Sequence, residues 1–120
     1  MMILLTMIFL HIVDDYYLQQ GILAQMKQKK FWKEQAPDEK YKYDYIWALI
    51  MHSFSWAFMV MLPLALGGGT ITPLFYFFFV TNVLVHGFTD DLKANQLKIN
   101  LWQDQLVHMA QILITFLALY

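Results

Sequence analysis

The fold of this chain is decided by an uncharged stretch of 45 residues, YIWALIMHSFSWAFMVMLPLALGGGTITPLFYFFFVTNVLVHGFT, at positions 45–89. A bilayer's hydrocarbon core is crossed by about 20 residues of helix, so this stretch is too long for a single crossing. We therefore predict two antiparallel helices, residues 45–66 and 73–92. Residues 66–70 (LGGGT) mark the turn, and Thr72 and Pro73 supply an N-cap and a first-turn proline.

The composition agrees with a membrane protein. Of the 120 residues, 59% are hydrophobic and only 14% charged, whereas about a quarter of the residues in a soluble domain are charged. A net charge of −1 argues against nucleic acid as a partner. The absence of cysteine excludes disulfides, thiolate nucleophiles and cysteine-ligated metal sites.

Two further uncharged stretches flank the central one, at residues 1–13 and 105–120. They predict helices over residues 2–25 and 101–120. The first apolar run spans only about 20 Å of helix, so the helix must continue through Asp14, Asp15 and Gln19 to cross the membrane. The expected fold is an all-α bundle of four transmembrane helices that forms one domain over residues 1–120.

The lysines predict the orientation of this bundle. All of them fall between the first and second helices or between the third and fourth: Lys27, Lys29, Lys30, Lys33, Lys40, Lys42, Lys93 and Lys98. The positive-inside rule then places both lysine-rich loops in the cytoplasm and both termini outside. Tryptophan, tyrosine and lysine in the longer loop predict contact with membrane lipids.

The four histidines supply the functional signal, since each falls in a different predicted helix. Three of them have an aspartate four positions away, which puts both side chains on one helix face, about 5 to 6 Å apart. His52, His86 and His108 lie at similar predicted depths, roughly 8 to 11 Å from the cytoplasmic helix ends. The candidate metal ligands are His11, Asp15, His52, His86, Asp90, Asp104 and His108.

Buried carboxylates are costly inside a bilayer and require partners, and a divalent cation would neutralise them. Imidazole and carboxylate ligands favour zinc, with manganese or iron as alternatives, and seven candidates allow one or two ions. Hydrogen bonding between helices is the simpler explanation for any single pair. Asp14, three residues after His11, is an alternative to Asp15 as the ligand.

Other polar residues are in register with these candidate ligands, and we assign roles to them. We assign Asp104 and Lys93 to catalysis, Asp104 as a carboxylate that takes a proton and Lys93 as a cation for an anionic substrate. Residues expected to support the ligands are Gln19, Asn82 and Gln111.

These polar residues predict a membrane-embedded metal-dependent hydrolase that acts from the cytoplasmic half of the bilayer on an amphiphilic or lipid-linked substrate. Two other classes stay open: an ion or proton transporter with a His/Asp relay, and a non-catalytic accessory or phage membrane protein. A homodimer that completes the site is also an open alternative.

The motifs HIVDDYYLQ (residues 11–19), His52, HGFTDDLK (residues 86–93) and DQLVH (residues 104–108) resemble a family signature. This signature belongs to the small bacterial and phage membrane proteins of domain of unknown function 3307, and the resemblance covers nearly the whole chain. The resemblance implies a location in the bacterial inner membrane, with a phage gene as an alternative origin, and it adds Gln105 to the supporting residues. The long lysine-rich loop and the Asp14-Asp15 doublet depart from the family's pattern. A looser likeness to small inner-membrane metal-dependent hydrolases implies hydrolysis.

Overall fold

The computed structural model describes residues 1–67 and 71–120, and within those ranges the chain is helical with no strand. The all-α prediction is confirmed for this part of the chain. The elements are α1 (Met2–Val13), a π-helical turn (Asp14–Leu18), α2 (Ile22–Met26), α3 (Lys29–Gln35), a 3-10 turn (Glu39–Tyr41), α4 (Asp44–Leu66), α5 (Pro73–Ala94) and α6 (Leu101–Leu119). Residues 68–70 of the predicted glycine turn lie outside the described residues.

The helices predicted over residues 45–66, 73–92 and 101–120 correspond to α4, α5 and α6. Thr72 caps α5 as expected, since its hydroxyl accepts from the Phe75 amide. Asn100 caps α6 and forms a reciprocal capping box with Gln103.

The helix predicted over residues 2–25 is interrupted, which corrects the prediction of one continuous crossing. It passes into the π-helical turn at Asp14 and stops after Leu18, and α2 is a separate segment of five residues. Gly21 has φ +65°, a backbone conformation that glycine adopts without steric cost and that no helix contains. The chain therefore changes direction here and carries Lys27 back toward the bundle.

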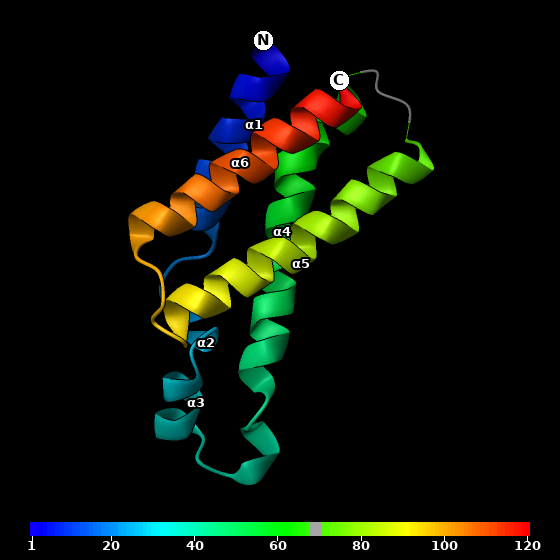
Figure 1. Ribbon diagram of the computed structural model, residues 1–120. Coiled ribbons are helices and arrows are strands. Elements are labelled where there is room, and N and C mark those ends of the chain that lie inside the picture. Colours follow the sequence, from blue (N-terminus) through cyan, green and yellow to red (C-terminus); the bar gives the residue numbers. More distant parts are fainter. Residues whose placement is uncertain (68–70) are drawn as a thin grey trace.

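The helices form a ring in which α4 and α6 each pack against both α1 and α5. The two termini lie at one end of the bundle, and α2 and α3 lie toward the other (Figure 1). Gly87 allows α5 to approach α4 closely, because a Cβ there would lie 2.9 Å from the Ser53 hydroxyl. This approach brings the neighbouring residue His86 beside His52 on α4.

The polarity of the bundle is inverted relative to a soluble domain. Polar and ionisable side chains from each helix of the ring are buried, including His11, Asp90, His108 and Gln111. Large apolar side chains instead cover the outer faces, for example Phe9, Trp47, Phe77, Leu84 and Leu117, each at least half exposed. A smaller apolar core, which includes Met7, Trp56, Val60 and Ile112, lies beside the polar interior.

By length and hydropathy alone, one helical segment in the described ranges could cross a membrane, Glu39–Leu66, and 44% of its apolar window is buried in the bundle. The four transmembrane helices predicted from the sequence are therefore not established by this criterion.

Candidate metal centre

Five of the predicted ligands meet inside the bundle, and they come from four separate segments of the chain. The π-helical turn supplies Asp15, α4 supplies His52, α5 supplies His86 and Asp90, and α6 supplies His108. They form two groups of three, Asp15 with His52 and His86, and His86 with Asp90 and His108, and in each group the potential ligand atoms lie within 4.8 Å of one another. His86 belongs to both groups, so the two triads form one continuous cluster.

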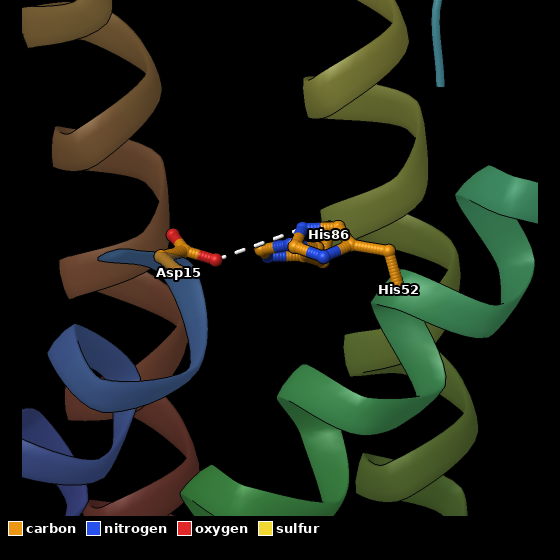
Figure 2. Close-up of side chains that lie close together, drawn as sticks. All are labelled: Asp15, His52 and His86. Carbon is orange, nitrogen blue, oxygen red and sulfur yellow. Dashed lines mark hydrogen bonds and ion pairs between the residues drawn. The ribbon is translucent and has the colours of Figure 1, made fainter. Parts of the chain in front are cut away.

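The first triad joins the amino-terminal segment to α4 and α5. Asp15 points toward the imidazoles of His52 and His86 from the opposite side of the site (Figure 2). Its Oδ1 lies 3.6 Å from His52 Nε2, and His52 Nε2 lies 2.9 Å from His86 Nε2. Two tetrahedral ligands about 2.0–2.1 Å from one zinc ion are about 3.3 Å apart, so these two nitrogens, which lie at hydrogen-bond distance, would separate by about 0.4 Å around the ion.

Asp90 connects the first triad to the second. Its Oδ2 lies 3.0 Å from His52 Nε2, while its Oδ1 lies 3.8 Å from His86 Nε2 and 3.5 Å from His108 Nε2. His86 and Asp90 are the i,i+4 pair expected from the sequence. A carboxylate that faces three imidazoles through two oxygens is placed to ligate one ion or to bridge two.

A chain of hydrogen bonds sets the orientation of His108. Gln111 donates through Nε2 to the Asn82 backbone carbonyl and side-chain oxygen, both at 3.1 Å, which leaves its Oε1 as an acceptor 3.3 Å from His108 Nδ1. In neutral His108 the proton therefore lies on Nδ1, and the lone pair of Nε2 faces carboxylate oxygens. Those oxygens are Asp90 Oδ1 at 3.5 Å and Asp104 Oδ1 at 3.3 Å, and a lone pair among them requires a proton or a metal ion between the groups.

Several of these ligand atoms are buried without a hydrogen-bond partner. Among the described residues the buried atoms without a partner are Asp14 Oδ2, Asp15 Oδ1, His52 Nδ1, His86 Nδ1, Asp104 Oδ1 and His108 Nε2. Of these, Asp15 Oδ1 and His108 Nε2 face other members of the triads. Buried polar atoms are nearly always paired in native proteins, because an unpaired one loses its hydration without compensation. A cation at the cluster would satisfy Asp15 Oδ1 and His108 Nε2 together.

The formal charge of the cluster matches a divalent ion. Four carboxylates lie in the cluster or directly beside it, and two ammonium groups contact them, Lys27 Nζ at 2.6 Å from Asp90 and Lys93 Nζ at 2.6 Å from Asp104. With neutral histidines this leaves two negative charges in a buried site. The carboxylates are Asp14, Asp15, Asp90 and Asp104.

The imidazole of His86 packs against two aromatic rings, those of Trp56 and His108. Its ring centroid lies 4.3 Å from that of Trp56 and 4.1 Å from that of His108, with interplanar angles of 21° and 28°. This packing fixes the ring with its Nε2 edge facing His52 and Asp90. Nε2 is therefore already oriented to ligate a metal ion. The sequence analysis did not identify Trp56, since an apolar residue in a membrane helix carries no functional signal by itself.

The structure does not bring His11 into either triad. Its Nδ1 accepts a hydrogen bond from the Trp56 indole at 2.7 Å, and its Nε2 lies 3.0 Å from Gln105 Oε1. Both ring nitrogens thus have partners, although Asp15 Oδ2 lies 3.5 Å from Nδ1. His11 is placed to support Asp15 and Gln105 and not to ligate an ion directly.

Asp104 and Lys93 lie beside the second triad. Asp104 is fully buried and reaches His108 through Oδ1, while its Oδ2 accepts from Lys93 at 2.6 Å and from Gln105 at 3.1 Å. Lys93 is about one-third exposed (33%), so it connects the buried carboxylate with solvent.

The predicted supporting residues take different positions. Gln105 contacts His11 and Asp104, and Gln111 contacts His108. Asn82 lies one step further out, bonded to Gln111 and Thr115. Gln19 lines the cavities that reach Asp15 and His52.

The doublet Asp14-Asp15 separates into two roles. Asp14 is fully buried, its Oδ1 accepts from the Ser55 hydroxyl at 2.7 Å, and it belongs to neither triad. Asp15 is the member that joins a ligand triad. The π-helical turn, which adds backbone to the helix at this point, is a feature often found at functional sites.

Lys27 is a functional candidate that the sequence analysis treated only as a loop lysine. The interruption at Gly21 folds it back so that Nζ meets Asp90, and Asn95 at the end of α5 fixes its backbone by donating to the Lys27 carbonyl at 2.9 Å. No i,i+4 spacing signals such a contact, because it depends on the path of the chain after the break.

The doublet offers a matched test of the ligand set. We expect Asp15→Asn to weaken zinc affinity by at least about tenfold, because it removes a charged ligand, whereas Asp14→Asn should change it much less. Competition with a chromophoric chelator measures both affinities on purified protein. Equal losses in the two variants would contradict the assignment of Asp15 as the ligand.

Comparison of the chain with protein-family models, curated proteins and solved structures finds no match. The resemblance to domain of unknown function 3307 therefore stays a prediction, and the functional argument depends on the geometry of the site.

Proposed function

We propose that this chain is a membrane-embedded metal-binding protein that works as a metal-dependent hydrolase on an amphiphilic or lipid-linked substrate. The observation that carries the proposal is the cluster of Asp15, His52, His86, Asp90 and His108, with its unpaired buried donor atoms. Zinc suits its imidazole and carboxylate donors best, with manganese or iron as alternatives, and two triads that share His86 have room for one or two ions.

The inverted polarity of the bundle supports placement in a membrane. An apolar exterior on this scale is unfavourable in water, and ionisable residues inside membrane bundles face the interior and pair there. In α5 and α6 the polar residues that lower the mean hydropathy are mostly those buried in the centre, so the outward faces are more apolar than the average indicates. We place the lysine-rich end in the cytoplasm and the protein in the bacterial inner membrane, with lipids as its partners.

Each step of hydrolysis can be assigned to a residue of the site. A bound divalent metal lowers the pKa of a water molecule to about 7. Asp104, with Oδ1 free of hydrogen bonds in the described structure, is placed to take the proton of that water. The water oxygen would then bond to the ester carbon or phosphorus as the ester bond breaks, and the departing oxygen would receive the proton that Asp104 had taken. Lys93 would stabilise the negative charge that develops.

Access to the site supports an enzyme over a purely structural centre. A cavity of about 430 Å³ reaches Asp15 and Asp90 and is also lined by Lys27 and Lys93. In the other direction, the polar chain from His108 through Gln111 and Asn82 ends at the buried Thr115. A proton or ion relay that crosses the whole bundle would require polar groups beyond Thr115. The apolar core lies there instead.

The proposal is tested by hydrolysis assays on the purified protein in phosphatidylcholine nanodiscs, with long-chain nitrophenyl ester and nitrophenyl phosphate substrates. Zinc-loaded protein should hydrolyse one of these classes, chelation should abolish the activity, and added zinc should restore it. Stoichiometric zinc without hydrolysis of either class would count against the enzyme, and zinc-dependent proton or ion flux in proteoliposomes would favour the relay.

A further inference from the structure

Two cavities of different chemical character reach the first triad. The polar cavity, about 430 Å³, reaches Asp15 and is lined by Lys27, Lys93 and Asp90. The apolar cavity, about 580 Å³, reaches His52 and is lined by Leu23, Met26, Trp32, Trp47 and Met51. Asp15 Oδ1 and His52 Nε2 are 3.6 Å apart, and Gln19 lines both cavities, so the two spaces flank the same pair of ligand atoms.

The polar cavity carries two cations. Lys27 and Lys93 each pair with a carboxylate of the cluster at 2.6 Å. Each ammonium group has three N–H donors and uses one of them on its carboxylate, so its other donors remain able to bind an anion. Lysine is a common ligand for phosphate, which accepts several charge-assisted hydrogen bonds at once.

The apolar cavity opens on the outer surface of the bundle. Leu23, Trp47 and Met51 at its edge are 46%, 67% and 66% exposed, so they are continuous with the apolar exterior. Both cavities fall within the 300–1,000 Å³ range typical of small-molecule sites. An alkyl chain could enter the apolar cavity from the surrounding lipid.

We propose that the two cavities bind one molecule, a phosphate-bearing lipid, with its phosphate between Lys27 and Lys93 and its alkyl chain along Trp47 and Met51. This inference rests on the proposed function and names its substrate class. It places the scissile bond at the junction of the cavities, beside Asp15 and His52, and it makes Lys27 a specificity-determining residue together with Lys93.

The test uses tryptophan fluorescence, because Trp32 and Trp47 line the apolar cavity. The probe is a lipid phosphonate with a dibrominated alkyl chain, which quenches nearby tryptophan and cannot be hydrolysed at its C–P bond. It is titrated as a minor component of alkyl maltoside micelles, whose detergent carries no phosphate, that hold zinc-loaded protein. We expect saturable quenching, weakened about tenfold by Lys93→Gln or Lys27→Gln, since each removes one charge-assisted contact.

Matched controls separate this site from general attraction to anionic lipid. Lys98→Gln and Lys30→Gln remove exposed lysines outside the polar cavity and should leave the affinity unchanged. Trp47→Phe should reduce the quenching amplitude, because it removes one of the two tryptophans that line the apolar cavity. A dibrominated alcohol with the same chain should quench weakly and without saturation.

Three outcomes would overturn the inference: equal binding of the phosphonate and the alcohol, equal weakening by Lys98→Gln and Lys93→Gln, or binding of inorganic phosphate as tight as that of the lipid. Different outcomes would contradict the hydrolase proposal. Lysine-dependent binding of the phosphonate without hydrolysis of the phosphate ester would support the lipid site and count against the enzyme, and hydrolysis of neutral esters without phosphonate binding would do the reverse.

Discussion

Replacement of His86 by phenylalanine is expected to remove the bound divalent metal from the purified protein. His86 belongs to both triads, so its loss takes a ligand from each, whatever the number of ions. Loss of a residue that only orients a ligand costs about 10–100-fold in metal affinity, and loss of the ligand itself should cost more than 100-fold. Elemental analysis of detergent-purified protein, after equilibration with zinc and desalting, measures the stoichiometry directly.

Phenylalanine is the appropriate substitution because it retains an aromatic ring packed against Trp56 and His108 while removing the ring nitrogens that would ligate a metal. Far-UV circular dichroism and size-exclusion chromatography should show a folded protein. The control is His11→Phe, which changes a buried histidine outside both triads and should leave zinc bound. Folded His86→Phe protein with wild-type zinc content would show that His86 is not a ligand.

Asp104→Asn is expected to reduce kcat by about 10²- to 10⁴-fold, the usual contribution of a positioned general base. Asp104 lies outside both triads, so the variant should keep its metal. Asparagine preserves the shape of the side chain and its contact with Gln105, but its amide cannot take a proton from water. The measurement is kcat and KM on the substrate class identified in nanodiscs, together with zinc content.

Asp91→Asn is the matched control for this charge change. Asp91 is the neighbour of Asp90 in the chain, but its carboxylate bonds to Asn95 and Gln96 at the end of α5. Its activity should stay close to that of the wild type. If Asp104→Asn loses zinc in proportion to activity, Asp104 acts as a ligand, and if it keeps full activity, its assignment as the base is wrong.

Helices α4, α5 and α6 could be predicted because local sequence signals determine their boundaries. The uncharged runs and the Thr72-Pro73 start depend only on residues that are neighbours in the sequence. The interruption of the first helix could not be predicted in this way. Gln19 and Gln20 are compatible with helix, and the π-helical turn at Asp14 depends on how the segment packs against α4.

The candidate site likewise has features that local sequence predicts and features that it does not. The pairs His86/Asp90 and Asp104/His108 follow from helix periodicity, and the structure places each pair on an inward face. Which nitrogen of a histidine is free depends on partners from other helices, such as Trp56 for His11 and Gln111 for His108. Lys27 reaches Asp90 through a change of chain direction at Gly21, which periodicity cannot reveal.

The central claim is that imidazoles and carboxylates from separate helices share a divalent cation, and zinc K-edge X-ray absorption tests it most directly. The account predicts a first shell of nitrogen and oxygen at about 2.0–2.2 Å, with outer-shell scattering from at least two imidazoles that is lost in His86→Phe. A fully hydrated ion without imidazole scattering, or no zinc retained by the wild-type protein after desalting, would contradict it.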